Sequence, residues 1–529
     1  MIWPGFIGET KKFIILTVKR YFMCFLSAIL LILSYAPFDL FFLAWIAFLP
    51  LFLFLYKTND YKKVFIGGFI FGFFYFLGNV YWIYHSLYHF GSVPLILSFF
   101  IVGLLTLYLA LYPCLFSLIY KNLLKNNIPA SLYAPFIWIC LEVLRSYLFT
   151  GFPWALIGYT QYKFLLIAQI SEITGIYGVS YLVVLFNCAV FDLLIFKKQK
   201  LNCPLMPYLP IIASSVAVLI IFIICVVYGF KKLSEPLNGY RFKAAIIQGS
   251  IPQNEKWVYE KINEILNIYK SLTIKAKYYN PDFVVWPETA VPFIFEKNRY
   301  FTSELVNFVK EQNIYLLFGS IMERKKDIYT NSAVLIDPNG IVAYYYDKIH
   351  LVPFGEYVPL RKILFFIDKI TVGIGDYQAG NSYNVAITPF GKFATLICYE
   401  IIFPGQVRKF YQKGGQFIVN ITNDGWFGNT SGPYQHFSMA VFRAIENRKP
   451  LIRVANSGIS GYIDSKGRII NKTRLFERVF LIENIQGNEK ITFYTKYGDI
   501  FAYICIVFSL IFIIGNISFG GKKWLHLRI

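Results

Sequence analysis

Cys398 is the residue of this chain that is best placed to act as a nucleophile. It follows the apolar run Phe393–Ile397, which is typical of a buried strand, and α/β folds place chemistry where strand ends face loops. No other cysteine lies between residues 231 and 498. A lone thiol is either a nucleophile or an ordinary buried apolar residue. The other cysteines lie in hydrophobic runs or between them: Cys24, Cys114, Cys140, Cys188, Cys203, Cys225 and Cys505.

A reactive thiol needs a base or a cation beside it. Glu288 stands just past a buried run and a proline, and Lys348 ends another run. A carboxylate beside the thiol would take its proton, and an ammonium would stabilise a developing oxyanion. Each residue alone is equally consistent with a surface charge, the commonest position of Glu and Lys. His350 and His436 are the histidines of this region that a Cys–His pair would use.

The same region lacks the patterns of metal and nucleotide sites. It has one cysteine, and its two histidines are 86 residues apart, which is not the spacing of zinc ligands. We find neither a phosphate-cradling glycine loop nor a dinucleotide fingerprint. We therefore expect no metal and no cofactor. The segment Asn420–Phe427 adds a polar turn after a buried run, and this turn either shapes the pocket or closes the strand.

Alternating strand and helix patterns fill residues 241–485 and predict one α/β domain with helix-covered sheets. A tight hairpin turn is expected at Asp337–Gly340. Helical patterns cover Trp257–Lys275, Ser303–Glu311 and Tyr434–Glu446. The predicted strands are Lys243–Gln248, Asp282–Trp286, Ile314–Ser320, Ala333–Ile336, Ile341–Tyr346, Ala394–Cys398, Gln416–Ile421, Leu451–Ala455 and Gly461–Asp464.

Composition indicates an integral membrane protein around this domain. Of the 529 residues, 57% are hydrophobic, 19% aromatic and only 15% charged, whereas soluble domains carry about a quarter charged residues. A net charge of +21 would suggest nucleic acid in a soluble protein. Here the membrane topology accounts for it, so we expect no nucleic-acid partner.

About eight transmembrane helices are expected, seven before residue 231 and one after residue 499. Each needs about 20 apolar residues, and the first two runs are short enough to form a hairpin that only just crosses. The long third run holds two spans. The uncharged runs are Tyr21–Phe38, Leu40–Tyr56, Val64–Tyr120, Asn126–Leu141, Ile173–Phe191, Leu201–Phe230 and Ile500–Gly521.

Basic residues gather in alternate loops and predict the orientation. Cytoplasmic loops carry the excess of Lys and Arg, which places both termini in the cytoplasm. The other loops contain almost no basic residues, and Lys163 is the exception. We expect a membrane domain at 1–230, an external catalytic domain at 231–498 and a final helix with a cytoplasmic tail at 499–529. The orienting residues are Lys11, Lys12, Lys19, Arg20, Lys57, Lys62, Lys63, Lys121, Lys125, Lys197, Lys198, Lys200, Lys522, Lys523 and Arg528.

Two features of the membrane domain invite a functional reading. Glu142 and Arg145 are three residues apart on a predicted helix, so they share a face and can pair. Such a pair is either functional or a lock on helix packing. The outward segments Gly151–Trp154 and Gly158–Gln161 either line a lipid entrance or anchor at the headgroups.

Three motifs together resemble the nitrilase, or carbon–nitrogen hydrolase, superfamily. They are WPET with Glu288, YYYDKIHLVPFGEY with Lys348, and ICYE with Cys398. The chain is more closely similar to the apolipoprotein N-acyltransferase family, the integral membrane branch of that superfamily. QGSIPQNEKW, NDGWFG and the membrane segments TGFPW and GYTQ carry this likeness, which covers nearly the whole chain.

The resemblance implies an αββα sandwich with a Glu-Lys-Cys triad. By this likeness Cys398 is the nucleophile, Glu288 the general base and Lys348 the oxyanion stabiliser. Glu356 orients the lysine. The family pattern also places three further residues in the pocket or its lid: Trp257, Tyr399 and Glu400.

The resemblance also implies the reaction and its setting. The thiol attacks the sn-1 ester of a phospholipid, typically phosphatidylethanolamine, and forms a thioester. The α-amino group of a diacylglyceryl-modified cysteine on an apolipoprotein then takes the acyl chain. Both substrates lie in the inner membrane, so the catalytic domain is expected on the periplasmic side. A dry site would disfavour hydrolysis of the thioester.

Two other functions compete with this one. A membrane-tethered nitrilase-type amidase that acts on a small amide would use the same triad, but it leaves the membrane frame and the GFPW segment unexplained. A transporter with an external sensor predicts ionisable residues near the bilayer midplane. Beyond Glu142 and Arg145 there are few, since Glu172 and Asp192 lie near helix ends. We expect the acyltransferase.

Overall fold

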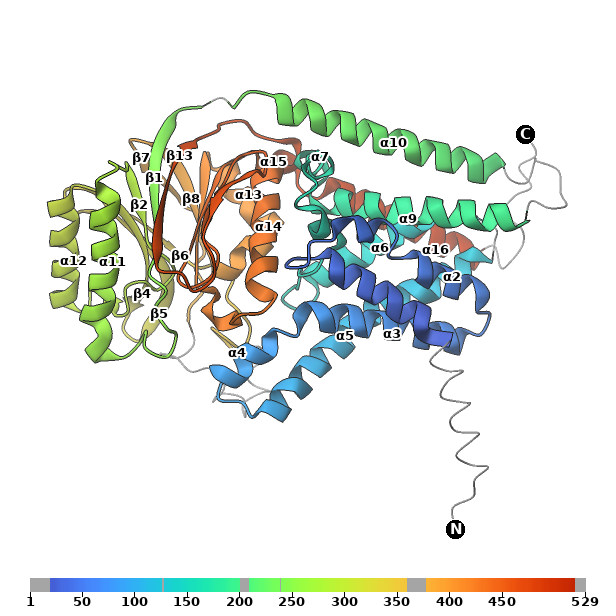
Figure 1. The fold of residues 1–529 in the computed structure, drawn as a ribbon, viewed down its shortest axis with the longest axis horizontal. Coiled ribbons are helices and arrows are strands. Elements are labelled where there is room, and N and C mark those ends of the chain that lie inside the picture. The colour runs from blue at the N-terminus through green and yellow to red at the C-terminus, as the bar shows by residue number, and fades with distance from the viewer. Residues whose placement is uncertain (1–19, 126–127, 200–208, 238, 359–376, 519–529) are drawn as a thin grey trace, which may run out of the picture.

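The computed structural model describes residues 20–125, 128–199, 209–237, 239–358 and 377–518. Figure 1 shows two parts side by side, an α/β part and a helical part. The chain leaves the helical part through α10 (Leu209–Ser234), forms the α/β part, and returns through α16 (Ile500–Ser518). The two ends of the α/β part are therefore both tied to the helical part.

The helical part is built from segments before and after the α/β part. Its other elements are Arg20–Ser34, η1 (Phe41–Trp45), α2 (Leu49–Lys57), α3 (Tyr61–Val80), α4 (Ile83–His89), α5 (Leu95–Leu124), α6 (Ala130–Tyr147), η2 (Ile157–Gln161), α7 (Leu165–Ala168), α8 (Ser171–Thr174), α9 (Ile176–Gln199) and α15 (Phe493–Tyr497).

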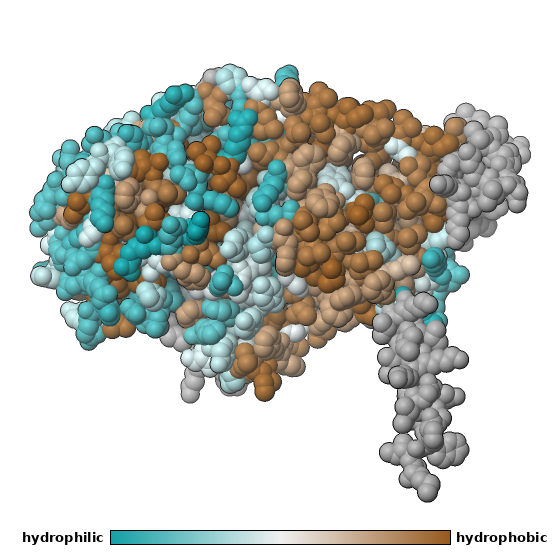
Figure 2. Space-filling view, in the orientation of Figure 1, coloured by the Kyte–Doolittle hydropathy of each residue, from teal (hydrophilic) through white to brown (hydrophobic). Residues whose placement is uncertain are grey.

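Four helices among the described residues are long and apolar enough to cross a membrane, namely α3, α5, α9 and α10. Figure 2 shows hydrophobic residues over most of the visible surface of the helical part, while the α/β part is mainly hydrophilic. So large an exposed apolar surface indicates lipid contact. The helical part is thus membrane-embedded, and the count of eight crossings stays a prediction. Shorter apolar helices cover Arg20–Ser34, Phe41–Lys57, Leu165–Thr174 and Ile500–Asn516.

The two ends of the helical part differ in charge and contacts. At one end the Lys121 ammonium donates to the Leu55 carbonyl at 3.0 Å. At the other end Ser86 donates to the Trp426 carbonyl of the α/β part at 2.8 Å. α3 runs between these ends over about 30 Å. The basic loops around Lys121 therefore lie opposite the α/β part. Cys203 and several of the orienting residues lie outside the described residues. These orienting residues are Lys11, Lys12, Lys19, Lys200, Lys522, Lys523 and Arg528.

The α/β part contains two sheets. Parallel strands β1, β2 and β4 form the centre of one, and parallel β8, β9 and β10 that of the other. The first sheet has the order β13 (Val479–Gln486), β1 (Arg241–Gln248), β2 (Phe283–Val285), β4 (Tyr315–Lys325), β5 (Ile328–Ile336), β6 (Val342–Asp347), with β3 (Ile294–Phe295) on β4. The second has the order β12 (Ile469–Lys472), β11 (Gly461–Ile463), β10 (Leu451–Ala455), β9 (Phe417–Thr422), β8 (Gly391–Ile397), β7 (Val385–Thr388).

The two sheets pack face to face between two layers of helices, so the predicted αββα sandwich is confirmed (Figure 1). Aromatic side chains fill the space between the sheets. The Phe242 and Phe417 ring centroids are 4.6 Å apart, and those of Phe283 and Phe393 are 5.2 Å apart. α11 (Ile262–Lys277) and α12 (Arg299–Gln312) cover one sheet. α13 (Pro404–Gln412) and α14 (Gly432–Asn447) cover the other, and α14 faces the helical part.

Most predicted elements of the sandwich are present. The nine predicted strands coincide with β1, β2, β4, β5, β6, β8, β9, β10 and β11, and the Asp337–Gly340 turn joins β5 to β6. The strands β3, β7, β12 and β13 were not predicted. The helix predicted for Trp257–Lys275 begins later than expected, at Ile262 in α11. Trp257 lies in a loop before η5 (Tyr259–Lys261).

Among the described residues, Glu142 and Arg145 do not form the ion pair that their helical spacing would allow. This is because each binds the backbone of the segment 151–161, here called the membrane loop. Arg145 donates to the carbonyls of Phe152 and Trp154 at 2.8 and 2.6 Å. Glu142 accepts from the Ile157 amide at 2.9 Å. The two charges hold the loop against α6.

Candidate active site

Cys398 stands where β8 ends and the 3-10 turn η7 (Cys398–Ile402) begins. Its φ of 51° lies in the left-handed region, which residues other than glycine rarely adopt, so the surrounding contacts must hold the turn. The side chain is only 8% exposed. The turn thus holds a buried thiol at a strand end.

Glu400 ties this turn to the loop that carries Lys348. One carboxylate oxygen accepts from the Ile397 amide at 2.8 Å, and the other accepts from the Ile349 amide at 2.8 Å and the Tyr346 hydroxyl at 2.7 Å. Burial raises the pKa of Glu400, while hydrogen bonds from the Ile397 amide, the Tyr346 hydroxyl and the His350 amide oppose the shift. A single buried carboxylate therefore sets the position of the turn relative to the lysine loop.

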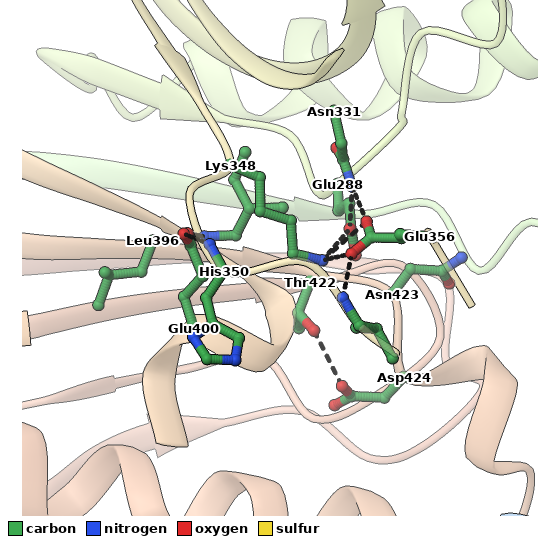
Figure 3. Close-up of polar contacts among 12 residues, drawn as sticks. Glu288, Asn331, Lys348, His350, Glu356, Leu396, Glu400, Thr422, Asn423 and Asp424 are labelled. Atoms are coloured by element: carbon green, nitrogen blue, oxygen red, sulfur yellow. Dashed lines mark hydrogen bonds and ion pairs between the residues drawn. The ribbon is translucent and has the colours of Figure 1, made fainter. Parts of the chain in front are cut away.

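Lys348 follows β6 and points into a group of carboxylates (Figure 3). Its Nζ lies 2.8 Å from Glu356 Oε2 and 3.7 Å from Glu288 Oε1. Asn331 on β5 donates to both carboxylates at 2.8 Å. Burial would lower the pKa of Lys348, but Glu356 and Glu288 raise it well above its usual value. The lysine therefore stays charged although it is buried.

Glu288 is held by the backbone around the end of β2. The Gly319 amide donates to the Pro287 carbonyl at 3.1 Å, and a Cβ on Gly319 would lie 2.6 Å from Glu288 Cα. Only glycine allows this close approach of β4. Lys256, which is buried, donates to the Glu288 carbonyl at 2.9 Å. Burial lowers the pKa of Lys256 to about 8, although Glu288 and Cys398 oppose this.

The thiol is protonated at rest. Burial raises the pKa of Cys398 to about 12, and the nearby carboxylates of Glu288 and Asp424 add to the rise. The Lys348 ammonium and the Thr422 hydroxyl act in the opposite direction. A base must therefore remove the proton as the sulfur reacts.

The remaining predicted residues lie around this group. Trp257 follows Lys256 and is 43% exposed. The Tyr399 ring centroid lies 5.1 Å from that of Phe403, on which His350 stacks at 3.7 Å. Burial lowers the pKa of His350 to about 4. His436 contacts Asp424 at 2.9 Å. Neither histidine makes a hydrogen bond to the thiol in the described structure, so the geometry does not favour a Cys–His pair.

Two polar residues of the site were not singled out from the sequence. Asn331 bridges the two carboxylates, and its signal was an amide inside the apolar strand β5. Lys256 touches Glu288 from a loop, where a lysine is ordinarily a surface charge. Among the described residues, no group of three or more His, Cys, Asp or Glu side chains is placed to hold a metal ion.

Comparison with known proteins identifies the class of the α/β part. Residues 243–489 match the sequence model of the family described as Carbon-nitrogen hydrolase. Among solved structures, the chain is similar to Nit3 of Saccharomyces cerevisiae, a member of branch 10 of the nitrilase superfamily. That match has 19% identity and a TM-score of 0.37, and covers 48% of this chain and 92% of that one.

The helical part narrows the class to one family. Residues 27–189 match the sequence model of the Apolipoprotein N-acyltransferase N-terminal domain. The apolipoprotein N-acyltransferase of Geobacter metallireducens is 41% identical over 96% of this chain and 97% of its own length. That of Rickettsia typhi is 34% identical over 93% and 97%. The chain belongs to the apolipoprotein N-acyltransferase family.

Proposed function

We propose that this protein N-acylates lipoproteins, moving an acyl chain from a phospholipid to an apolipoprotein. Family membership supports the overall reaction. The observation that carries the chemistry is the buried group of Glu288, Lys348 and Glu356 at the strand-end edge that also bears Cys398. It combines a base, a fixed cation and a protected thiol in one membrane-bound protein.

In the first step Glu288 takes the thiol proton, and the sulfur attacks the sn-1 ester carbonyl of the phospholipid. The carbonyl oxygen becomes an oxyanion beside the Lys348 ammonium, which stabilises it. The C–O bond then breaks, and Glu288 returns the proton to the leaving alkoxide. The products are an acyl thioester on Cys398 and a lysophospholipid. Glu356 and Asn331 hold the lysine and the base in place.

In the second step the α-amino group of the diacylglyceryl-cysteine attacks the thioester. Glu288 takes a proton from the nitrogen and gives it to the departing sulfur, which restores the thiol. An amide forms and a thioester breaks, so no external energy source is needed. The burial of Cys398 limits access of water, the competing acceptor.

The setting that we propose follows from the charged loops and the position of the sandwich. The catalytic domain, 231–498, lies on the periplasmic side of the inner membrane. The segments 1–230 and 499–529 anchor it, and both termini lie in the cytoplasm. Phosphatidylethanolamine is the proposed donor. The membrane loop and Trp257, Tyr399 and Glu400 lie near the route of the acyl chain or support its walls.

A competition between acceptors tests this function. The full chain in detergent receives phosphatidylethanolamine and a peptide that begins with diacylglyceryl-cysteine, and mass spectrometry follows both products. We expect N-acylated peptide and lysophospholipid in equal amounts. Free fatty acid with unmodified peptide would instead identify a hydrolase. Glu288→Gln should be inactive, and Cys140→Ala, a thiol of the helical part, should be as active as the wild type.

A further inference from the structure

Thr422 lies beside the proposed nucleophile at the neighbouring strand end. β8 and β9 are parallel, and their register pairs Ile397 with Ile421, so the next residues along each strand, Cys398 and Thr422, are neighbours. Thr422 is fully buried. Its hydroxyl acts to lower the pKa of the Cys398 thiol. A buried hydroxyl is therefore available to the sulfur.

A buried charge cluster controls where this hydroxyl points. The Thr422 hydroxyl donates to Asp424 Oδ1 at 2.9 Å (Figure 3). The His436 ring contacts the same oxygen at 2.9 Å, and Arg453 donates to the other oxygen at 2.8 Å. Burial opposes the charged form, but Arg453 and His436 lower the pKa of Asp424 to about 2. Asp424 is thus an anion balanced by Arg453.

The membrane loop reaches this cluster from the other side. The Trp154 ring stacks on His436, with centroids 5.8 Å apart and planes at 28°. Its indole N–H donates to Gln435 on α14 at 2.7 Å. Arg145, in turn, holds the Trp154 carbonyl at 2.6 Å. A continuous set of contacts therefore runs from the membrane helix α6 to the residue beside the thiol.

We propose that Thr422 is a further catalytic residue, which turns its hydroxyl from Asp424 to the Cys398 sulfur as the thiolate forms. The hydrogen bond to Asp424 breaks and one to the sulfur replaces it, while Asp424 keeps His436 and Arg453. No proton is transferred when this hydrogen bond changes partner, because Glu288 holds the proton that left the sulfur. Trp154 is a positioning residue that holds His436. The inference rests on the proposed role of Cys398.

The charges around the sulfur come from every neighbouring strand end, so a pH profile must be compared between variants that leave them intact. Substitution of Thr422 does this, since the residue is neutral. Four charged groups interact electrostatically with Cys398, namely Glu288, Lys348, Asp424 and Lys256. Glu356, His436 and Arg453 contact members of this group, and Glu400 binds the Ile397 amide next to Cys398.

The test is the rate at which iodoacetamide alkylates Cys398 between pH 6 and 10, in the full chain in detergent, with the Cys398 peptide quantified by mass spectrometry. Thr422→Val and Thr422→Ala remove the hydroxyl, and Thr422→Ser keeps it. We expect the two hydroxyl-free variants to react about tenfold more slowly below the thiol pKa. Thr422→Ser should follow the wild-type profile. Trp154→Phe, which keeps an aromatic ring but loses the indole N–H, should lie between.

Either hydroxyl-free variant overturns the inference if it is folded and follows the wild-type profile. Thermal unfolding identifies the folded variants, and the alanine substitution serves if valine disturbs the packing. If neither hydroxyl-free variant folds, the other two variants decide. The inference is then overturned when Trp154→Phe follows the wild-type profile and Thr422→Ser reacts more slowly than the wild type. Alkylation needs no phospholipid, so a failure of the proposed acyl transfer would be seen separately in the lipid assay.

Discussion

The helical part and the sandwich each contain a carboxylate and a cation that the sequence suggested as partners, and the two sets make different contacts. Glu142 and Arg145 are three residues apart on α6, yet each binds the backbone of the membrane loop. Glu288 and Lys348 are 60 residues apart in the sequence, yet their charged atoms lie 3.7 Å apart. Near a helix end, unpaired backbone groups compete for charged side chains. At the strand ends of a sandwich, side chains from distant segments converge. Topology predicts such contacts better than spacing does.

The largest effect is expected from the sandwich pair. Lys348→Met removes the cation that would stabilise the oxyanion and leaves Glu288 facing Glu356 without it, so the rate of lysophospholipid release should fall about a thousandfold. Lys297→Met is the matched control, because this lysine is exposed and pairs with Glu323 at the surface. A loss of less than tenfold in Lys348→Met would show that strand-end convergence does not make this pair functional.

The helical pair should respond unequally to substitution. Arg145→Met leaves the buried carbonyls of the membrane loop without donors and should cost about 3 kcal/mol of stability. Glu142→Gln keeps an oxygen that can accept from Trp138 and Ile157, and should cost less than about 1 kcal/mol. Thermal unfolding in detergent measures both. Equal losses of stability in the two variants would instead indicate that Glu142 and Arg145 form a direct ion pair.

A smaller, pH-dependent effect is expected at Asp424, another strand-end residue. Its pKa in the folded protein is about 2, below the ordinary value of 3.8. The ionised form therefore stabilises the fold by about 2 kcal/mol above pH 4, and this contribution is lost as the pH falls through about 2. Asp424→Asn lacks it. The difference in unfolding free energy between wild type and Asp424→Asn should shrink on acidification. A constant difference would mean that Asp424 carries no such charge.

The sequence allowed the central strands of one α/β domain to be predicted, because buried parallel strands appear as continuous apolar runs. The αββα arrangement was expected from the family resemblance. The sequence also placed Glu288, Lys348 and Cys398 at strand ends. The edge strands β7 and β12 escaped prediction, since they are short and half exposed. The site contacts of Asn331 and of Lys256, which lies within QGSIPQNEKW, could not be predicted, because their partners lie in other segments and only the folded chain brings them together.

The partners of Glu142 and Arg145 were missed for a related reason. Helical spacing places the two side chains on one face, but it contains no information on the path of the following loop. That loop returns against α6 and presents three carbonyls to Arg145. Similarly, the segment Gly151–Trp154 suggested either a lipid entrance or an anchor at the headgroups. The contacts of Trp154 with Gln435 and His436 depend instead on the docking of α14.

The most direct test of the account is a search for the thioester on Cys398. The full chain in detergent receives phosphatidylethanolamine with a labelled sn-1 acyl chain and no acceptor. We expect label on the protein that hydroxylamine removes, present in the wild type and in Cys140→Ala and absent from Cys398→Ala. A folded wild type without label, or label that persists in Cys398→Ala, would contradict the account.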